Sequence, residues 1–139
     1  MTSPETDSDP DLTLRPALRD RLLTLAREGA PEEVCGVLGG RDGRVTRVEP
    51  VPNVAATPET RYELDPAATV EAIERVEDST AHLGFYHSHP RGPPEPSATD
   101  EAQATWPGFV YCIVSLPGSR VRAWRWTGDA FERLTVSAE

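Results

Sequence analysis

The chain has 139 residues, a length that suits one domain with an apolar core of ordinary size. Its net charge of −9, from 23 acidic and 14 basic residues, argues against a nucleic-acid partner, because phosphate binding needs clustered Lys and Arg. No apolar run approaches the roughly 20 residues of a membrane-spanning helix, and two cysteines are too few for a disulfide scaffold.

The chain is expected to start with a disordered acidic leader over residues 1–11, since this stretch has no apolar periodicity. It also lacks the basic start and the apolar run of a secretory signal, so we expect a cytoplasmic protein with one folded domain over 12–139. A first helix is predicted from Pro16, because Pro suits the first helical position and leucines recur at helical spacing up to Gly29.

A hairpin follows, with strands predicted over residues 33–39 and 44–51 and a turn at 41–43. A loop then leads to a short extended piece around residues 62–64. A second helix is predicted from Pro66.

The second half of the chain alternates strands with one short helix. A strand over 82–87 precedes a loop over 90–96, which is too rich in Gly and Pro to be regular. Ser97 then suits the N-cap of a helix that ends near Thr105. Three more strands are predicted over 109–116, 120–126 and 130–136. The elements together predict an α/β (more narrowly α+β) fold, in which helices flank a mixed, mainly antiparallel β-sheet.

Residues that can bind a metal concentrate where the strand over 82–87 ends. His87 and His89 are two positions apart on a strand, so their side chains project from the same side, and Asp100 in the next helix can join them. An isolated His pair is a weak signal, but two imidazoles and a carboxylate suit Zn²⁺ and leave one tetrahedral position for water. We therefore predict one zinc ion per chain, bound by His87, His89 and Asp100.

The spacing His-x-His, seven residues, Ser, two residues, Asp resembles the motif of the JAMM/MPN+ (Mov34/PAD-1) zinc metallopeptidases. The segment 31–40, PEEVCGVLGG, is similar to that family's upstream P-x-E-x-C-G-x-L-x-G, and residues 84–90, GFYHSHP, are similar to its approach to the metal. The resemblance covers about residues 13–136. It implies an MPN/JAMM core with cytidine-deaminase-like layers.

The resemblance also implies roles for single residues. Glu33 would hold and deprotonate the attacking water, and the E-x-C-G register favours it over its neighbour Glu32. Ser97 would donate a hydrogen bond to the oxyanion, while its suitability as an N-cap stays open beside that role. Cys35 and Cys112 are expected in the core, because no free His is left to activate Cys35 as a nucleophile.

By the same resemblance the chain is a metal-dependent peptidase acting on ubiquitin-like small modifier proteins that end in Gly-Gly. It would release them from target lysines or from linear fusions by means of metal-activated water. The acidic surface and the absence of lysine resemble haloarchaeal proteins, which favours a small archaeal modifier as the partner. A GC-rich genome would explain the arginines but not the acidic excess.

Other functions stay open at this point. A bacterial-type relative releases cysteine from a sulfur-carrier protein. A non-catalytic MPN scaffold typically lacks the metal ligands that this chain has. A zinc deaminase would need an H-x-E and a P-C-x-x-C signature, and both are missing. Neither a nucleic acid nor a membrane is expected as a partner, and the sequence leaves the oligomeric state undetermined.

Overall fold

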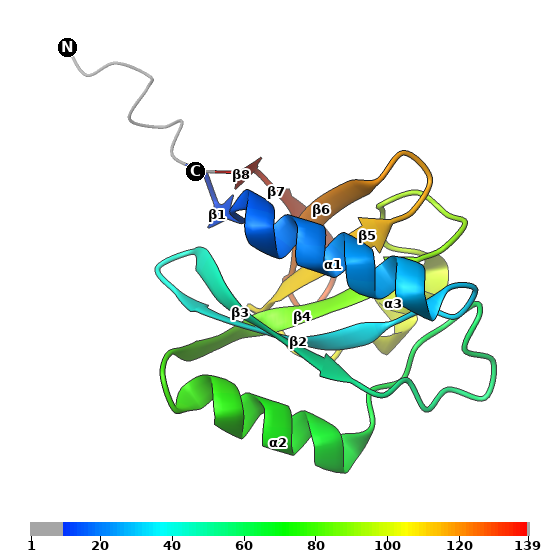
Figure 1. Ribbon diagram of the computed structural model, residues 1–139, viewed down its shortest axis with the longest axis horizontal. Helices are drawn as coiled ribbons and strands as arrows, with labels where there is room; N and C mark the ends of the chain where they lie inside the picture. The colour runs from blue at the N-terminus through cyan, green and yellow to red at the C-terminus, as the bar shows by residue number, and fades with distance from the viewer. Residues whose placement is uncertain (1–9, 139) are drawn as a thin grey trace.

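A computed structural model describes residues 10–138, which build one mixed eight-stranded sheet with a long helix against each face (Figure 1). The elements in chain order are β1 (Leu12–Thr13), α1 (Pro16–Gly29), β2 (Cys35–Arg41), β3 (Arg44–Val51), α2 (Pro66–Glu77), β4 (Ala81–His89), α3 (Ala98–Gln103), β5 (Val110–Ser115), β6 (Arg120–Trp126), β7 (Phe131–Leu134) and β8 (Val136–Ser137). Within residues 10–138 the helices are all too short or too polar to cross a membrane.

The N-terminal and C-terminal segments of the described domain are hydrogen-bonded to each other. The predicted leader lies outside the described residues over positions 1–9. Asp11 already belongs to the folded part, because its carboxylate accepts a hydrogen bond from the Thr135 backbone N–H at 2.9 Å. The Asp11 backbone N–H in turn donates to the Thr135 hydroxyl at 2.9 Å, so the two ends of the domain are tied together.

The hairpin β2–β3 forms around the predicted tight turn. Asp42 and Gly43 both have positive φ, 55° and 74°, the backbone that a two-residue hairpin turn requires and that Asp-Gly tolerates. Strand β3 has the predicted bounds, whereas β2 begins at Cys35, two residues later than predicted. Glu33 and Val34 therefore lie just before the strand.

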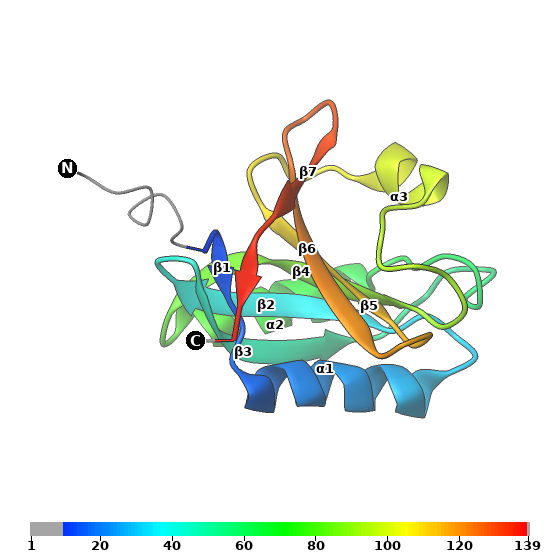
Figure 2. The same cartoon turned by 90° about the horizontal axis from the view of Figure 1, so that it is seen from above.

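The strand order is β7-β6-β5-β4-β2-β3-β1-β8, so β4 runs through the middle of the sheet. It pairs antiparallel with β2 and parallel with β5. The two edge strands, β7 and β8, are separated in sequence by Thr135 alone, so the sheet must curl until its edges approach each other (Figure 2). The predicted strand over 130–136 is thus two strands. The two-residue strands β1 and β8 were not predicted.

Side-chain alternation along β4 divides the core into two layers. Tyr86 packs with Leu22 and Ala26 of α1 on one face of the sheet. Phe85 packs with Ala72 and Val76 of α2 on the other face. His87 lies two positions after Phe85 and therefore points to the α2 side.

Both cysteines are free and buried, as expected, with 1% of Cys35 and 0% of Cys112 exposed. The predicted mixed sheet with flanking helices is present, and His87, near the end of β4, points to the α2 side.

Candidate metal centre

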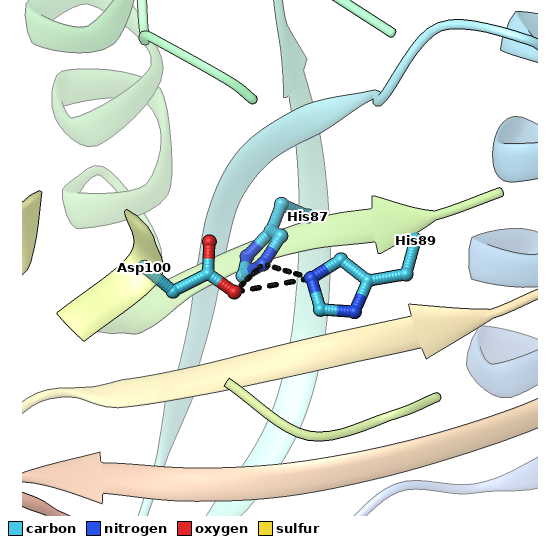
Figure 3. A group of neighbouring side chains, drawn as sticks. All are labelled: His87, His89 and Asp100. Atoms are coloured by element: carbon cyan, nitrogen blue, oxygen red, sulfur yellow. Dashed lines mark hydrogen bonds and ion pairs between the residues drawn. The ribbon is translucent and has the colours of Figure 1, made fainter. Parts of the chain in front are cut away.

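Three side-chain atoms from β4 and α3 converge at the end of β4 (Figure 3). His87 Nε2 lies 3.2 Å from His89 Nε2 and 3.1 Å from Asp100 Oδ2, and His89 Nε2 lies 3.0 Å from the same oxygen. All three residues are buried. The structure therefore brings together the three predicted metal ligands, which form a group able to hold a metal ion.

The size of this triangle fits a metal ion at its centre. Ligand atoms roughly 2.0–2.2 Å from a tetrahedral zinc are about 3.3–3.6 Å apart, slightly more than the 3.0–3.2 Å found here. Two neutral imidazoles with hydrogen on Nδ1 would turn two lone pairs and a carboxylate oxygen toward each other. A cation relieves that repulsion, so the donor set suits Zn²⁺.

The loop after β4 fixes the chemical form of His89. Its Nδ1 lies 2.7 Å from the carbonyl oxygen of Pro93, which can only accept, so Nδ1 carries a hydrogen. In the neutral ring, Nε2 then keeps its lone pair for a metal. Burial works against a charge on His89, but the hydrogen bond to Asp100 outweighs it and raises the pKa of His89.

A capping box holds Asp100 in place at the start of α3. The Ser97 hydroxyl accepts from the Asp100 backbone N–H at 3.0 Å, and the Ser97 backbone N–H donates to Asp100 Oδ2 at 2.9 Å. Burial opposes ionisation of Asp100, yet the contacts of its carboxylate with the Nε2 atoms of His87 and His89 hold its pKa well below the usual range. Asp100 is thus a charged carboxylate at neutral pH. Ser97 is the N-cap, and its hydroxyl proton is still available to another acceptor.

Glu33 lies beside this group and has only 7% of its surface exposed, whereas Glu32 is exposed. Among the described residues, Glu33 Oε1 is buried without a hydrogen-bond partner. Burial raises the pKa of Glu33 to about 7; the charge of His89 lowers it and that of Asp100 raises it further. A buried carboxylate that titrates near neutrality suits proton transfer. The structure therefore places Glu33 next to the three predicted ligands, and Glu32 at the surface.

The backbone around Glu33 is tied to β4 by Ser88, the residue between the two histidines. The buried Ser88 hydroxyl accepts from the Val34 backbone N–H at 2.8 Å, and the Ser88 N–H donates to the Val34 carbonyl at 3.0 Å. These bonds fix the approach of Glu33 to the strand that carries the ligands.

Two neighbours of the site were given no chemical role from the sequence, Asn53 and Tyr62. The Asn53 amide donates to the Glu33 carbonyl at 2.9 Å, and the Tyr62 ring stacks on His87. His82, the third histidine, is not part of the group: its Nε2 is 3.1 Å from the Gly84 carbonyl, and its ring packs against Trp106 and other aromatic rings.

A cavity of about 550 Å³ lies next to the candidate metal centre. Tyr62 belongs to its wall and contacts His87, so the cavity and the metal ligands share a boundary. Most of the wall is apolar and comes from α2 and from the segment after α3, including Val70, Ile73 and Trp106. The site can therefore receive an extended, partly apolar ligand beside a metal.

Cysteine chemistry does not fit this site. Burial raises the pKa of Cys35 to about 12, so its thiol is protonated at neutral pH and is a poor nucleophile. The nucleophile of a hydrolytic reaction at this site would therefore be water and not the Cys35 thiol.

Comparison with known proteins gives a consistent result. The model of the prokaryotic homologs of the JAB domain matches residues 15–127. A desampylase of Haloferax volcanii is 52% identical over 135 residues, which are 92% of this chain and 96% of that protein. A probable TtuB-protein conjugate cleaving protease of Thermus thermophilus is 42% identical over 76% of this chain and 70% of its own length.

A solved JAB1/MPN domain protein of Archaeoglobus fulgidus superposes with a TM-score of 0.62 at 18% identity, over 91% of this chain and 96% of that one. At that identity the likeness concerns the fold, and it confirms the predicted α+β fold class.

Proposed function

This chain belongs to the family of prokaryotic homologs of the JAB domain, and on that premise we propose that it is a zinc-dependent isopeptidase. We propose that it binds one Zn²⁺ through His87, His89 and Asp100 and releases small ubiquitin-like modifier proteins from their targets. The observation that carries the proposal is the triangle of ligand atoms 3.0–3.2 Å apart, in a chain 52% identical to a desampylase.

The zinc ion, when bound, supplies Lewis-acid chemistry, which polarises a carbonyl and lowers the pKa of water from 15.7 towards roughly 7. Glu33 takes the proton of the attacking water, because its carboxylate is buried beside the ligands and titrates near neutrality. The water oxygen bonds to the scissile carbonyl carbon, and the C–N bond breaks. Glu33 then passes the proton to the departing amine.

Ser97 is suited to stabilise the oxyanion that develops from the scissile carbonyl. Its hydroxyl oxygen already accepts from the Asp100 N–H, so its hydroxyl proton points elsewhere and can be donated. The capping role and the catalytic role therefore use different parts of one hydroxyl group.

The substrate proposal rests on the shape and lining of the site. A modifier tail that ends in Gly-Gly has no side chains next to the scissile bond, so it can reach a buried metal. The apolar cavity beside Tyr62 offers space for the preceding residues of the tail. The leaving group is the ε-amine of a target lysine or the N-terminus of a linear fusion.

The test is incubation of the zinc-loaded chain with a purified Gly-Gly-ended archaeal modifier joined to a lysine side chain, followed by mass spectrometry. A carrier protein that ends in a cysteine adduct is the comparison substrate, because it separates an isopeptidase from a cysteine-releasing peptidase. Free modifier and free target are expected. Cleavage that survives complete removal of zinc, or cleavage of the cysteine adduct alone, would overturn the proposal.

A further inference from the structure

The two histidines of the metal centre are supported in different ways. His89 is oriented by a hydrogen bond from Nδ1 to the Pro93 carbonyl at 2.7 Å. His87 Nδ1, although buried, has no hydrogen-bond partner among the described residues. A metal-binding histidine usually has such a partner, which fixes the orientation of its ring. A contact other than a hydrogen bond must therefore fix the orientation of the His87 ring.

The ring of Tyr62 packs against the face of the His87 imidazole ring. The two ring centroids are 4.2 Å apart and the planes make an angle of 20°, which is a stacked arrangement. A nearly parallel ring at this distance blocks rotation of the imidazole about its bond to Cβ. It keeps Nε2 directed at His89 and Asp100.

Tyr62 is itself held by one side chain, Asn53. The Asn53 Nδ2 donates to the carbonyl of Arg61 at 3.1 Å, and its Oδ1 accepts from the N–H of Glu63 at 2.9 Å. The residues on both sides of Tyr62 are thus bound to the same amide. Because Nδ2 also donates to the Glu33 carbonyl at 2.9 Å, the Tyr62 backbone and the Glu33 backbone share one anchor.

We propose that Tyr62 is a positioning residue for the metal ligand His87, and that its ring face replaces the hydrogen bond that His89 receives from Pro93. This inference rests on the proposed function, because it takes His87 as a zinc ligand. It assigns the aromatic ring, and not the phenol hydroxyl, to the task. It also makes the segment between Asn53 and Leu64 part of the metal centre, although this segment contributes no ligand.

The experiment measures zinc affinity of the full chain by competition with a chromophoric chelator. Tyr62→Met removes the ring but keeps an apolar side chain of similar length, and Tyr62→Phe keeps the ring and removes the hydroxyl. Trp106→Leu is the matched control, since Trp106 lines the same cavity but makes edge-to-face contacts with His82, Phe85 and Phe109 and none with His87 that the structure records. We expect Tyr62→Met to bind zinc about 10–100-fold more weakly. The other two variants should bind it as wild type does.

The outcomes separate this inference from the proposed function. A wild-type chain that binds no zinc contradicts the proposed function, whereas wild-type affinity in Tyr62→Met contradicts the role of Tyr62 alone. Equal losses in Tyr62→Phe and Tyr62→Met would assign the effect to the hydroxyl and overturn the inference. The urea midpoint of each metal-free variant distinguishes a local effect on the metal centre from general destabilisation. If zinc affinity falls in proportion to that midpoint in all three variants, Trp106→Leu included, the role of Tyr62 is contradicted.

A second measurement needs no variant, so it decides the matter even if Tyr62→Met does not fold. In the NMR spectrum of the zinc-loaded wild-type chain, stacking on Tyr62 should shift the ring protons of His87 upfield relative to those of His89. Absence of that difference would overturn the inference.

Discussion

Replacement of Glu33 by Gln should stabilise the metal-free chain at neutral and alkaline pH, although it should destroy catalysis. Burial raises the pKa of Glu33 from 4.5 to about 7, so the folded chain holds the proton more tightly than the unfolded chain does. Below about pH 4.5 the Glu33 carboxyl group is protonated in both the folded and the unfolded chain, so its burial carries no charge penalty. As the pH rises from about 4.5 through about 7, the unfolded chain loses its proton first, and the folded state loses stability.

The size of the effect follows from the shift. Each pKa unit corresponds to about 1.36 kcal/mol, so a rise from 4.5 to about 7 corresponds to roughly 3 kcal/mol, or about 2 kcal/mol after allowance for solvent screening. Gln has nearly the shape of a protonated Glu and carries no charge at any pH. The free energy of unfolding of Glu33→Gln should therefore equal that of wild type near pH 4 and exceed it by about 2 kcal/mol near pH 8.

The assay is urea unfolding of the metal-free chains in the presence of a chelator, over pH 4–8 at constant salt. Taking the difference between two variants cancels the titration of the groups that do not interact with Glu33; the contribution of His89, whose charge lowers the pKa of Glu33, remains in the difference. Glu32→Gln is the matched control, because Glu32 is the adjacent residue and is exposed. A difference between Glu33→Gln and wild type that is the same at pH 4 and pH 8 would refute the reasoning, as would an equal pH-dependent gain in Glu32→Gln.

Three further outcomes are expected. Glu33→Gln should still bind zinc but lose turnover of the modifier conjugate, while Glu32→Gln keeps it; normal turnover in Glu33→Gln would move the base elsewhere. Ser97→Ala should lower kcat by about 10²–10³-fold and the free energy of unfolding by about 1 kcal/mol, measured by steady-state kinetics and urea titration. Zinc at 100 times its Kd should raise the free energy of unfolding by about 2.7 kcal/mol, a gain that Asp100→Asn should largely lose in the same titration.

The helices and the hairpin were predictable because their signals are local. Pro16 and Pro66 stand at the first positions of α1 and α2, and the Asp42-Gly43 turn fixes the ends of β2 and β3. Short strands leave no such signal: β1 and β8 are two residues each and exist only because other strands pair with them. Helix α3 ends at Gln103, two residues earlier than predicted.

The candidate site likewise contains residues that the sequence could predict and one that it could not. His87, His89 and Asp100 could be predicted because a strand, a loop of fixed length and a helix start determine where they lie. Tyr62 could not be assigned a role, since its contact with His87 depends on the path of the 24 residues between them and on the bonds of Asn53. Sequence spacing describes neighbours along the chain, whereas such a contact is set by tertiary packing.

The environments of two carboxylates at the site explain why residues of the same chemical type are suited to different tasks. Asp100 Oδ2 lies 3.1 and 3.0 Å from the Nε2 atoms of His87 and His89 and accepts a hydrogen bond from the Ser97 backbone N–H, so its pKa is low and it stays charged, as a metal ligand must. Glu33 has one oxygen without a partner, and burial raises its pKa to about 7. Separation of two carboxyl pKa values in this manner is typical of sites that divide permanent charge from proton transfer.

The charge of a bound metal ion would also act on Glu33. A cation held by His87, His89 and Asp100 lies close to Glu33 and favours its charged form, so zinc should lower the pKa of Glu33 below about 7. The metal-free chain then keeps much of Glu33 protonated at neutral pH, and the zinc-loaded chain has it ready to accept a proton. We therefore expect metal binding to activate the proposed base, because the charge that makes Glu33 costly to bury is the charge that the cation would compensate.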